Sequence, residues 1–270
     1  MSIIVNSQPQ PGKTTEYRLS IQADLNGFSF SVTDDRLNSL LYLYSSDFVM
    51  DRGDPDSFAK KSSDLFYSQP LLRSKYKNVD LIYNTEKFTS VPKQLHKFGD
   101  EINIMSKLFK IEELEEINIR EIPKEEMVLL FAVNSTFLNV IKEHQPTFSL
   151  YPSAYVYLSY LPLFKEYNKI FFQYQKGFTT ILAAEGERIV FSNTFPASHF
   201  NSALYFLLLV LKEVQFNPEQ TSVYISGNIR DLEIYDIAKY FSKVKYFRNP
   251  AIPLSDQFAE MRYSTMMFQL

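Results

Sequence analysis

The sequence predicts a two-lobed α/β protein, in which each lobe is a mixed sheet that opens with an antiparallel meander and is flanked by helices. The first observation is a series of three strand-like segments within residues 15–50. A second such series within residues 169–194 repeats that order and is followed by a helix, a strand and a helix. The length of 270 residues agrees with this duplication, because domains of roughly 150 residues give about two lobes.

The first meander rests on alternation of apolar and polar side chains. From Tyr17 to Leu25, every second residue is apolar, which is the period of a half-buried strand. Asn26-Gly27 follows, a pair that favours a tight hairpin because both positions accept positive φ. Phe28, Phe30 and Val32 continue the alternation, and residues 40–44 supply a third strand.

The segment after the meander predicts mixed structure and an acidic stretch. Apolar spacing predicts a helix within residues 57–77, followed by a short strand at 79–83. Residues 90–92 read as the start of another helix. Residues 107–126 are densely acidic, a composition typical of a solvated face, with a docking surface for a basic partner as the alternative.

A strand–helix–strand–helix passage then connects the two repeats. Residues 127–133 form an apolar run typical of a buried central strand. Asn134 can cap a helix over 136–143, because its side chain accepts hydrogen bonds from the first free backbone amides. Residues 147–151 predict a short strand, and an aromatic helix that packs in the core or between lobes follows from Ser153.

The second repeat is predicted in the same way from alternation, turn residues and helical spacing. Its expected strands are 169–175, 178–184, 188–194 and 221–225, and its expected helices are 197–214 and 231–241.

Composition excludes several function classes. The 28 basic and 31 acidic residues give a net charge of −3, which disfavours nucleic-acid binding through phosphate neutralisation. The absence of cysteine excludes disulfides, cysteine zinc sites and thiol nucleophiles. His96, His144 and His199 are too far apart in the sequence to form a short metal motif, so no metal site is predicted. Only 7 glycines are present where average usage gives about 19, which disfavours a well-formed phosphate loop.

No transmembrane segment is predicted. The longest apolar run, residues 203–211, is much shorter than the roughly 20 residues that a spanning helix needs. The N-terminus lacks the basic and apolar regions of a signal peptide, so we expect a cytoplasmic protein.

The duplicated order of elements, above all within residues 127–194, resembles the actin-like ATPase superfamily with its ribonuclease H-like fold. It is most similar to the pilus-assembly, secretion and cell-division members, and also to a bacterial family of unknown function for which an actin-like fold is expected. The resemblance implies a first lobe over 1–152, with the acidic insertion near 107–126. It implies a second lobe over 153–270, whose C-terminal segment can pack back on the first.

The resemblance also locates three loops that hold nucleotide in active members, beginning with the motif D-x-G-x-x-x-S/T in the first lobe. Asp24 supplies the acid that would orient Mg²⁺ and water. Asn26 stands where the glycine is expected, Gly27 comes one position late, and Phe30 replaces the hydroxyl residue.

The second and third loops depart further from the family pattern. A gap-free placement puts Gln173 at the acid, Gln175 at the glycine and Thr179 at the hydroxyl, so the second acid is missing. The adenosine loop usually carries paired glycines, whereas this chain has Ser226-Gly227. Gly27, Gly177 and Gly227 nevertheless fall in or beside the three loops, either as a relic of a nucleotide-binding ancestor or because turns need glycine.

The sequence therefore favours a non-catalytic scaffold or adaptor, with no cofactor and no catalytic residue, that binds an unidentified protein partner through one lobe or the interlobe cleft. The 24 Phe and 18 Tyr residues support an interface, because aromatic side chains are enriched there. The alternative is a divergent ATP-binding protein or ATPase switch that binds ATP and Mg²⁺ in the cleft; a phosphorylated metabolite is a third reading. Under the alternative, the cofactor-binding residues are Asp24, Asn26, Gly27, Gln173, Gly177, Thr179, Ser226 and Gly227.

Overall fold

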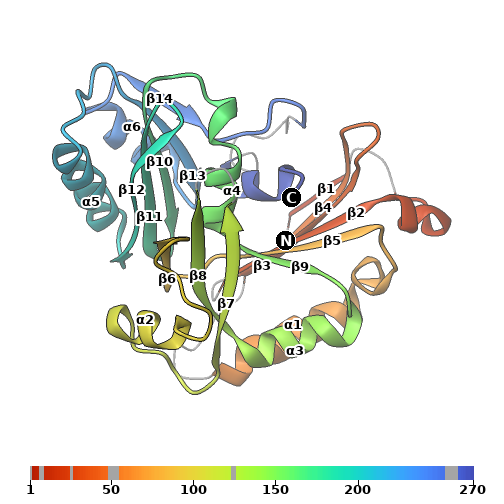
Figure 1. The fold of residues 1–270 in the computed structure, drawn as a ribbon. Coiled ribbons are helices and arrows are strands. Elements are labelled where there is room, and N and C mark those ends of the chain that lie inside the picture. Colours follow the sequence, from red (N-terminus) through yellow and green to blue (C-terminus); the bar gives the residue numbers. More distant parts are fainter. Residues whose placement is uncertain (1, 6–8, 25–26, 48–54, 123–125, 253–260) are drawn as a thin grey trace.

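The computed structural model describes residues 2–5, 9–24, 27–47, 55–122, 126–252 and 261–270, and it contains two large mixed sheets and a smaller one (Figure 1). The first sheet has six strands in the order β1-β4-β3-β2-β5-β9. These strands are β1 (Ser2–Val5), β2 (Arg18–Asp24), β3 (Gly27–Asp34), β4 (Ser39–Asp47), β5 (Asn78–Tyr83) and β9 (Ser149–Pro152).

The second sheet has five strands in the order β12-β11-β10-β13-β14. These strands are β10 (Asn168–Gln175), β11 (Gly177–Glu185), β12 (Arg188–Ala197), β13 (Ser222–Gly227) and β14 (Lys243–Tyr246). Each expected strand of the second repeat is present, which confirms the predicted duplication.

Apart from the extra edge strand β1 of the first sheet, the two large sheets share one topology and one register. The strands β2–β3–β4 and β10–β11–β12 are antiparallel meanders, and a parallel strand, β5 or β13, pairs with the first strand of each. Arg18 lies opposite Asn78 in the first sheet, and Lys169 lies opposite Ser222 in the second. Residues of the two lobes can therefore be matched position by position.

Helices cover the outer face of each large sheet. In the first lobe α1 (Pro55–Ser68) and α3 (Ser135–His144) pack on β2 and β3 around the buried Phe66 and Phe137. Asn134 caps α3 as predicted, since its Oδ1 accepts a hydrogen bond from the backbone amide of Phe137 at 2.9 Å. In the second lobe α5 (Phe200–Glu213) and α6 (Asp231–Ala238) form the equivalent layer.

The third sheet confirms one expectation about the middle of the chain and corrects another. Residues 127–133 lie in β8 (Met127–Asn134), which is the buried central strand of a separate antiparallel sheet. The segment expected to start a helix at 90–92 is β6 (Phe88–Pro92), which pairs with β8 from Phe88 opposite Phe131. Residues 127–133 are apolar on both faces of the strand because α2 (Glu101–Leu108) buries one face of β8 and the main body buries the other.

The acidic stretch contributes the third strand of this small sheet. After exposed Glu112 and Glu113, the chain enters β7 (Glu115–Ile122), which pairs with β8 and forms the sheet edge. Alternation places Ile117 against the cluster under α2, while the acidic side chains remain at least partly exposed.

Two short segments pack between the large sheets. They are α4 (Ser153–Ser159), which follows β9, and residues 261–270 with the short 3-10 turn Ser264–Met267. Figure 1 shows the C-terminus between the two lobes, and Phe268 joins the apolar cluster that both sheets share. Within the described residues, no helix is long and apolar enough to cross a membrane.

Candidate functional site at the lobe junction

The sequence-predicted site of the first lobe lies at the turn between β2 and β3. Asp24 ends β2 and pairs with Gly27, the first residue of β3. The side chain of Asp24 and the whole of Asn26 lie outside the described residues. The backbone therefore confirms a hairpin at the predicted place, and the proposed contact of Asp24 with Mg²⁺ stays a prediction.

The matched turn of the second lobe corrects the sequence alignment by two positions. Gln175 ends β10 and pairs with Phe178, as Asp24 pairs with Gly27. The structural counterpart of Asp24 is thus Gln175, whereas the gap-free alignment chose Gln173. Gly177 lies in the turn with φ of 118°, a conformation that glycine adopts without strain.

Gln173 instead lies inside the junction of the two lobes, where it is 2% exposed. Its Oε1 accepts a hydrogen bond from Ser153 Oγ of α4 at 3.0 Å, and its Nε2 donates to Asn84 Oδ1 at 3.2 Å. The backbone amide of Asn84 donates to the carbonyl of Ala23, next to Asp24, at 2.9 Å. Gln173 therefore connects the second sheet to the end of β2 and to α4.

Thr179 and Ser226 also make hydrogen bonds inside the protein. Thr179 Oγ1 donates to the backbone carbonyl of Gln173 at 2.8 Å, and this threonine is fully buried. The hydroxyls of Ser226 and Tyr157 lie 2.7 Å apart. Burial raises the pKa of Tyr157, which keeps the phenol neutral.

Gly227 is required by a close backbone approach. Its φ is +91°, and a Cβ at this position would lie 2.2 Å from the carbonyl oxygen of Tyr174. The next residue, Asn228, donates its backbone amide to that same carbonyl at 2.8 Å. The glycine therefore closes the end of β13 onto β10.

The hydrogen-bonding side chains that the structure describes at the junction share one kind of chemistry. Gln173, Asn84, Ser153, Thr179 and Ser226 are neutral amides and hydroxyls, and none titrates near neutral pH. Across the described part of the chain, no cluster of three His, Cys, Asp or Glu side chains could hold a metal ion. The sequence does not indicate Asn84, Ser153 or Tyr157 as site residues, because only the fold brings β5, α4 and β10 together.

A charged cluster at the opposite end of β2 has no sequence motif either. Arg18, a buried residue of β2, forms ion pairs with Asp80 of β5 and with Asp35, the latter at 3.0 Å. It also donates to the backbone carbonyl of Leu270 at 3.0 Å. Burial raises the pKa of Asp80 to about 6, although the Arg18 guanidinium opposes that shift. The only sequence signal for this charged cluster is a charged residue within each of two apolar strands, β2 and β5.

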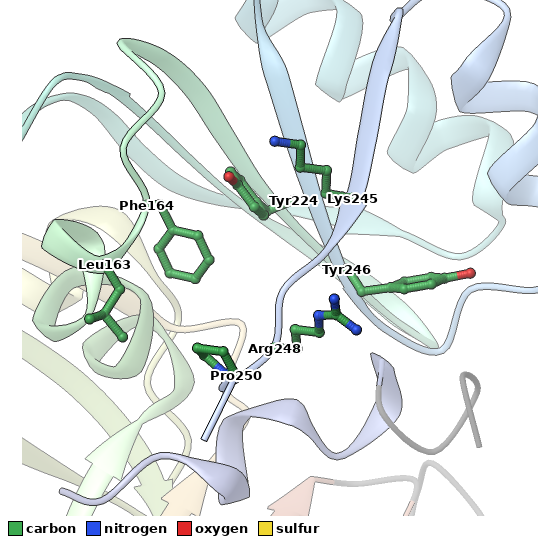
Figure 2. A pocket seen from close by; sticks show the side chains of 7 residues that line it. All are labelled: Leu163, Phe164, Tyr224, Lys245, Tyr246, Arg248 and Pro250. Atoms are coloured by element: carbon green, nitrogen blue, oxygen red, sulfur yellow. The ribbon is translucent and has the colours of Figure 1, made fainter. Parts of the chain in front are cut away.

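A surface cavity at the edge of the second sheet measures about 460 Å³ (Figure 2). Aromatic rings and two cationic side chains line it, together with Leu163 and Pro250. The lining aromatic and cationic residues are Phe164, Tyr224, Lys245, Tyr246 and Arg248.

Beside this cavity, Glu166 binds two of the surrounding groups. Its carboxylate accepts hydrogen bonds from the Tyr224 hydroxyl and the Lys245 ammonium. Partial burial would raise the pKa of Glu166, but these two donors hold it at about 2. A second cavity of about 400 Å³ lies between β7, α3 and β9. Of the sequence-predicted residues whose side chains the structure describes, namely Gly27, Gln173, Gly177, Thr179, Ser226 and Gly227, none lines these two cavities.

The family described as protein of unknown function (DUF3822) matches residues 6–249. The chain belongs to this family. No curated protein matches it significantly.

Solved structures show which fold this DUF3822 chain shares. A Bacteroides thetaiotaomicron protein with an actin-like ATPase fold and unknown function aligns with a TM-score of 0.81 at 20% identity, covering 97% of this chain and all of that one. The PilM–PilN type IV pilus biogenesis complex contains a chain that aligns at 0.56 and 11% identity, covering 94% and 97%. The ethanolamine utilization protein EutJ of Carboxydothermus hydrogenoformans aligns at 0.51 and 14%, covering 98% and 93%. The predicted two-lobed actin-like fold is thereby confirmed.

Proposed function

We propose that this DUF3822 chain is a non-catalytic actin-like scaffold that binds a partner protein and does not hydrolyse ATP. The observation that carries the proposal is the buried hydrogen-bond network around Gln173. A phosphate-binding turn needs backbone and hydroxyl donors that face an open site. Here the matched turn of the second lobe has Gln175 in place of an acid, and the neighbouring side chains of Gln173, Thr179 and Ser226 are buried and bonded to other groups of the same chain.

The proposed partner site is the cavity of Figure 2. Its rings and its Arg248 guanidinium are the residue types that protein interfaces favour, and Leu163 beside them is 52% exposed. The ammonium of Lys245 also lines the cavity and is paired with Glu166. We expect the partner to insert an apolar side chain flanked by a carboxylate. The PilM–PilN complex includes a chain of the same fold. This supports partner binding as a use of this architecture.

Calorimetric titration of Mg-ATP, and separately of ADP, tests the loss of nucleotide binding. The proposal expects heats that equal those of dilution. Binding tighter than about 100 μM, roughly −5.5 kcal/mol, would contradict it and support the ATP-binding alternative. In that case Asp24→Ala would be compared with wild type, because the alternative assigns the metal to Asp24.

A pull-down from the native cytoplasm tests the partner site. Wild type and an Arg248→Glu variant would be compared, with Arg36→Glu as the matched control because Arg36 is an exposed arginine on the other lobe. We expect one protein to be recovered by wild type and by the control and to be lost with Arg248→Glu. Repeated recovery of no partner, or equal recovery by all three proteins, would contradict the proposal.

We assign residues 1–152 to the first lobe and 153–270 to the second, with α4 as the first element after the boundary. We also propose that the scaffold works in the cytoplasm.

A further inference from the structure

Residues 261–270 lie between the two large sheets and join neither of them (Figure 1). The segment contains one short 3-10 turn, Ser264–Met267, and pairs with none of the described strands. Five of its apolar side chains are nevertheless at most 4% exposed, namely Met261, Tyr263, Met266, Met267 and Phe268. The rest of the chain therefore encloses these side chains as it would enclose those of a bound peptide.

The backbone of this segment is held by side chains of the main body. Backbone carbonyls inside a protein need donors, and in helices and sheets these donors are backbone amides. Four carbonyls of residues 261–270 instead accept hydrogen bonds from side chains. The donors are Arg18 and Gln22 of β2, Tyr160 after α4 and Asn249 after β14. For example, Asn249 Nδ2 donates to the carbonyl of Met267 at 2.7 Å.

These donors come from both lobes, so the segment is bound from two sides. Hydrogen bonds to backbone groups give affinity for a peptide whatever its side chains, and pockets for side chains add specificity. The backbone contacts of residues 261–270 are of the first kind. A different peptide in the same position could form them equally well.

Phe268 supplies the specific contact. Its ring centre lies 4.5 Å from that of Tyr160 and 4.8 Å from that of Phe247, and the side chain is 1% exposed. Aromatic anchors in desolvated pockets contribute most of the binding energy at interfaces. Three of the seven methionines of the chain, Met261, Met266 and Met267, fill the space around this anchor. Methionine adapts to irregular surfaces, which suits a ligand that is exchanged.

We infer that the lobe junction is a peptide-binding site and that residues 261–270 are the peptide it holds from its own chain. We define this junction peptide site by its contacts to the segment: Arg18, Gln22, Tyr160, Phe247 and Asn249. Release of the segment opens the site to an extended peptide of another protein. The site shares no residue with the lining of the cavity in Figure 2, so the inference does not depend on the partner proposed there.

The charges of the junction peptide site define the class of peptide. Its cation, Arg18, already forms ion pairs with Asp35 and Asp80. The other polar members are two amides and a phenol, which donate to neutral carbonyls. An acidic side chain would therefore find no unpaired cation among these five residues. We expect an uncharged, extended peptide that places an aromatic ring where Phe268 lies.

Thiol labelling tests whether the segment is released while the rest of the chain stays folded. The chain contains no cysteine, so a single introduced thiol reports on one position. Met267→Cys places it in the segment, and Ala203→Cys places the control thiol in the fully buried core under α5. We expect Met267→Cys to be labelled roughly a hundredfold faster, because local opening needs less free energy than global unfolding. Equal labelling rates would overturn the inference, since the segment would then leave only when the whole protein unfolds.

Binding of a fluorescent peptide with the sequence of residues 261–270 tests the site itself. A tethered segment competes at an effective concentration on the order of millimolar, so wild type should bind little peptide below about 100 μM. Phe268→Asp weakens the hold on the chain's own segment and leaves the junction peptide site unchanged. This variant should bind the peptide at least about tenfold tighter than wild type does. Phe98→Asp is the matched control, because Phe98 is 95% exposed, and it should behave as wild type.

A second peptide carrying Phe268→Ala tests the anchor without altering the protein. It should bind the Phe268→Asp variant at least about tenfold more weakly than the unaltered peptide. Equal binding of the two peptides would overturn the inference. So would a Phe268→Asp variant that melts cooperatively and binds neither peptide. If this variant does not fold, the labelling rates of Met267→Cys and Ala203→Cys decide the question.

Discussion

The two lobes share the same strand pairing, but their matched buried cations have different partners. Arg18 and Lys169 occupy matched positions, opposite Asn78 and Ser222. Arg18 is neutralised by two carboxylates, Asp80 and Asp35, whereas Lys169 donates to the backbone carbonyls of Phe164 and Glu166 at 2.7 and 2.6 Å. One register therefore accepts either a buried ion-pair cluster or a lysine satisfied by carbonyls, and the two lobes should respond differently to mutation and to pH.

The largest expected effect comes from removing the cation of the first lobe. Arg18→Met leaves Asp80 buried without its partner, and breaking a buried ion pair in this way costs about 3–5 kcal/mol. Lys169→Met leaves only neutral carbonyls unpaired, which costs about 1–3 kcal/mol. Urea unfolding of both variants measures the difference. Equal losses in the free energy of unfolding would show that leaving the Asp80 charge unpaired costs no more than leaving neutral carbonyls unpaired.

Next in size is the effect of a methyl group at the end of β13. Gly227→Ala forces a side chain into a φ of +91° and brings its Cβ against the Tyr174 carbonyl. Strain and overpacking together should lower the free energy of unfolding by about 3 kcal/mol. The first lobe has Tyr83 at the matched position, opposite Ala23, so this constraint belongs to the second lobe. Gly12→Ala, which meets open space, is the control and should change stability little.

The carboxylates of the two lobes should give opposite pH dependences. The pKa of Asp80 is raised to about 6, so its contribution to stability is present below its ordinary pKa near 4 and is lost as pH rises through about 6. The pKa of Glu166 is lowered to about 2, so its contribution is present above its ordinary pKa and is lost as pH falls toward 2. Each effect is on the order of 2 kcal/mol, reduced for Glu166 by its partial exposure.

Urea unfolding at several pH values distinguishes these contributions. Asp80→Asn should flatten the fall in stability between about pH 4 and pH 6, and Glu166→Gln should flatten the loss below about pH 4. Either substitution leaving the profile unchanged would show that its carboxylate does not cause that part of the curve.

These contrasts also show what the sequence could and could not predict. Alternation and turn residues located the meanders, because strand period and hairpin turns are local properties of the chain. The separate small sheet is not predicted, because an apolar run such as Met127–Val133 has the same pattern in the middle of a large sheet and in a small sheet buried between α2 and the main body. The sequence places Gln173 in a phosphate loop, since its true partners Ser153 and Asn84 are distant in the sequence. The alignment error of two residues kept the side chain on the same face of β10, so alternation could not reveal it.

The smallest expected effect tests whether the two junctions are equivalent. Gln22 and Gln173 occupy matched positions, and each binds a hydroxyl from a segment packed between the sheets, Thr265 for Gln22 and Ser153 for Gln173. Gln22 also donates to the carbonyl of Arg262 at 3.2 Å. Replacing either glutamine by leucine leaves buried partners unpaired and should lower the free energy of unfolding by about 1–2 kcal/mol.

Hydrogen exchange identifies which segment each glutamine holds. Gln22→Leu should speed amide exchange in residues 261–270, whereas Gln173→Leu should speed it in α4, because local opening follows the contacts that are lost. Gln94→Leu, on the exposed turn after β6, is the control and should alter neither segment. If either junction variant accelerates exchange in both segments equally, the two junctions open as one unit. In that case the two lobes open as a single cooperative unit, and the two repeats do not have separate local stabilities at the junction.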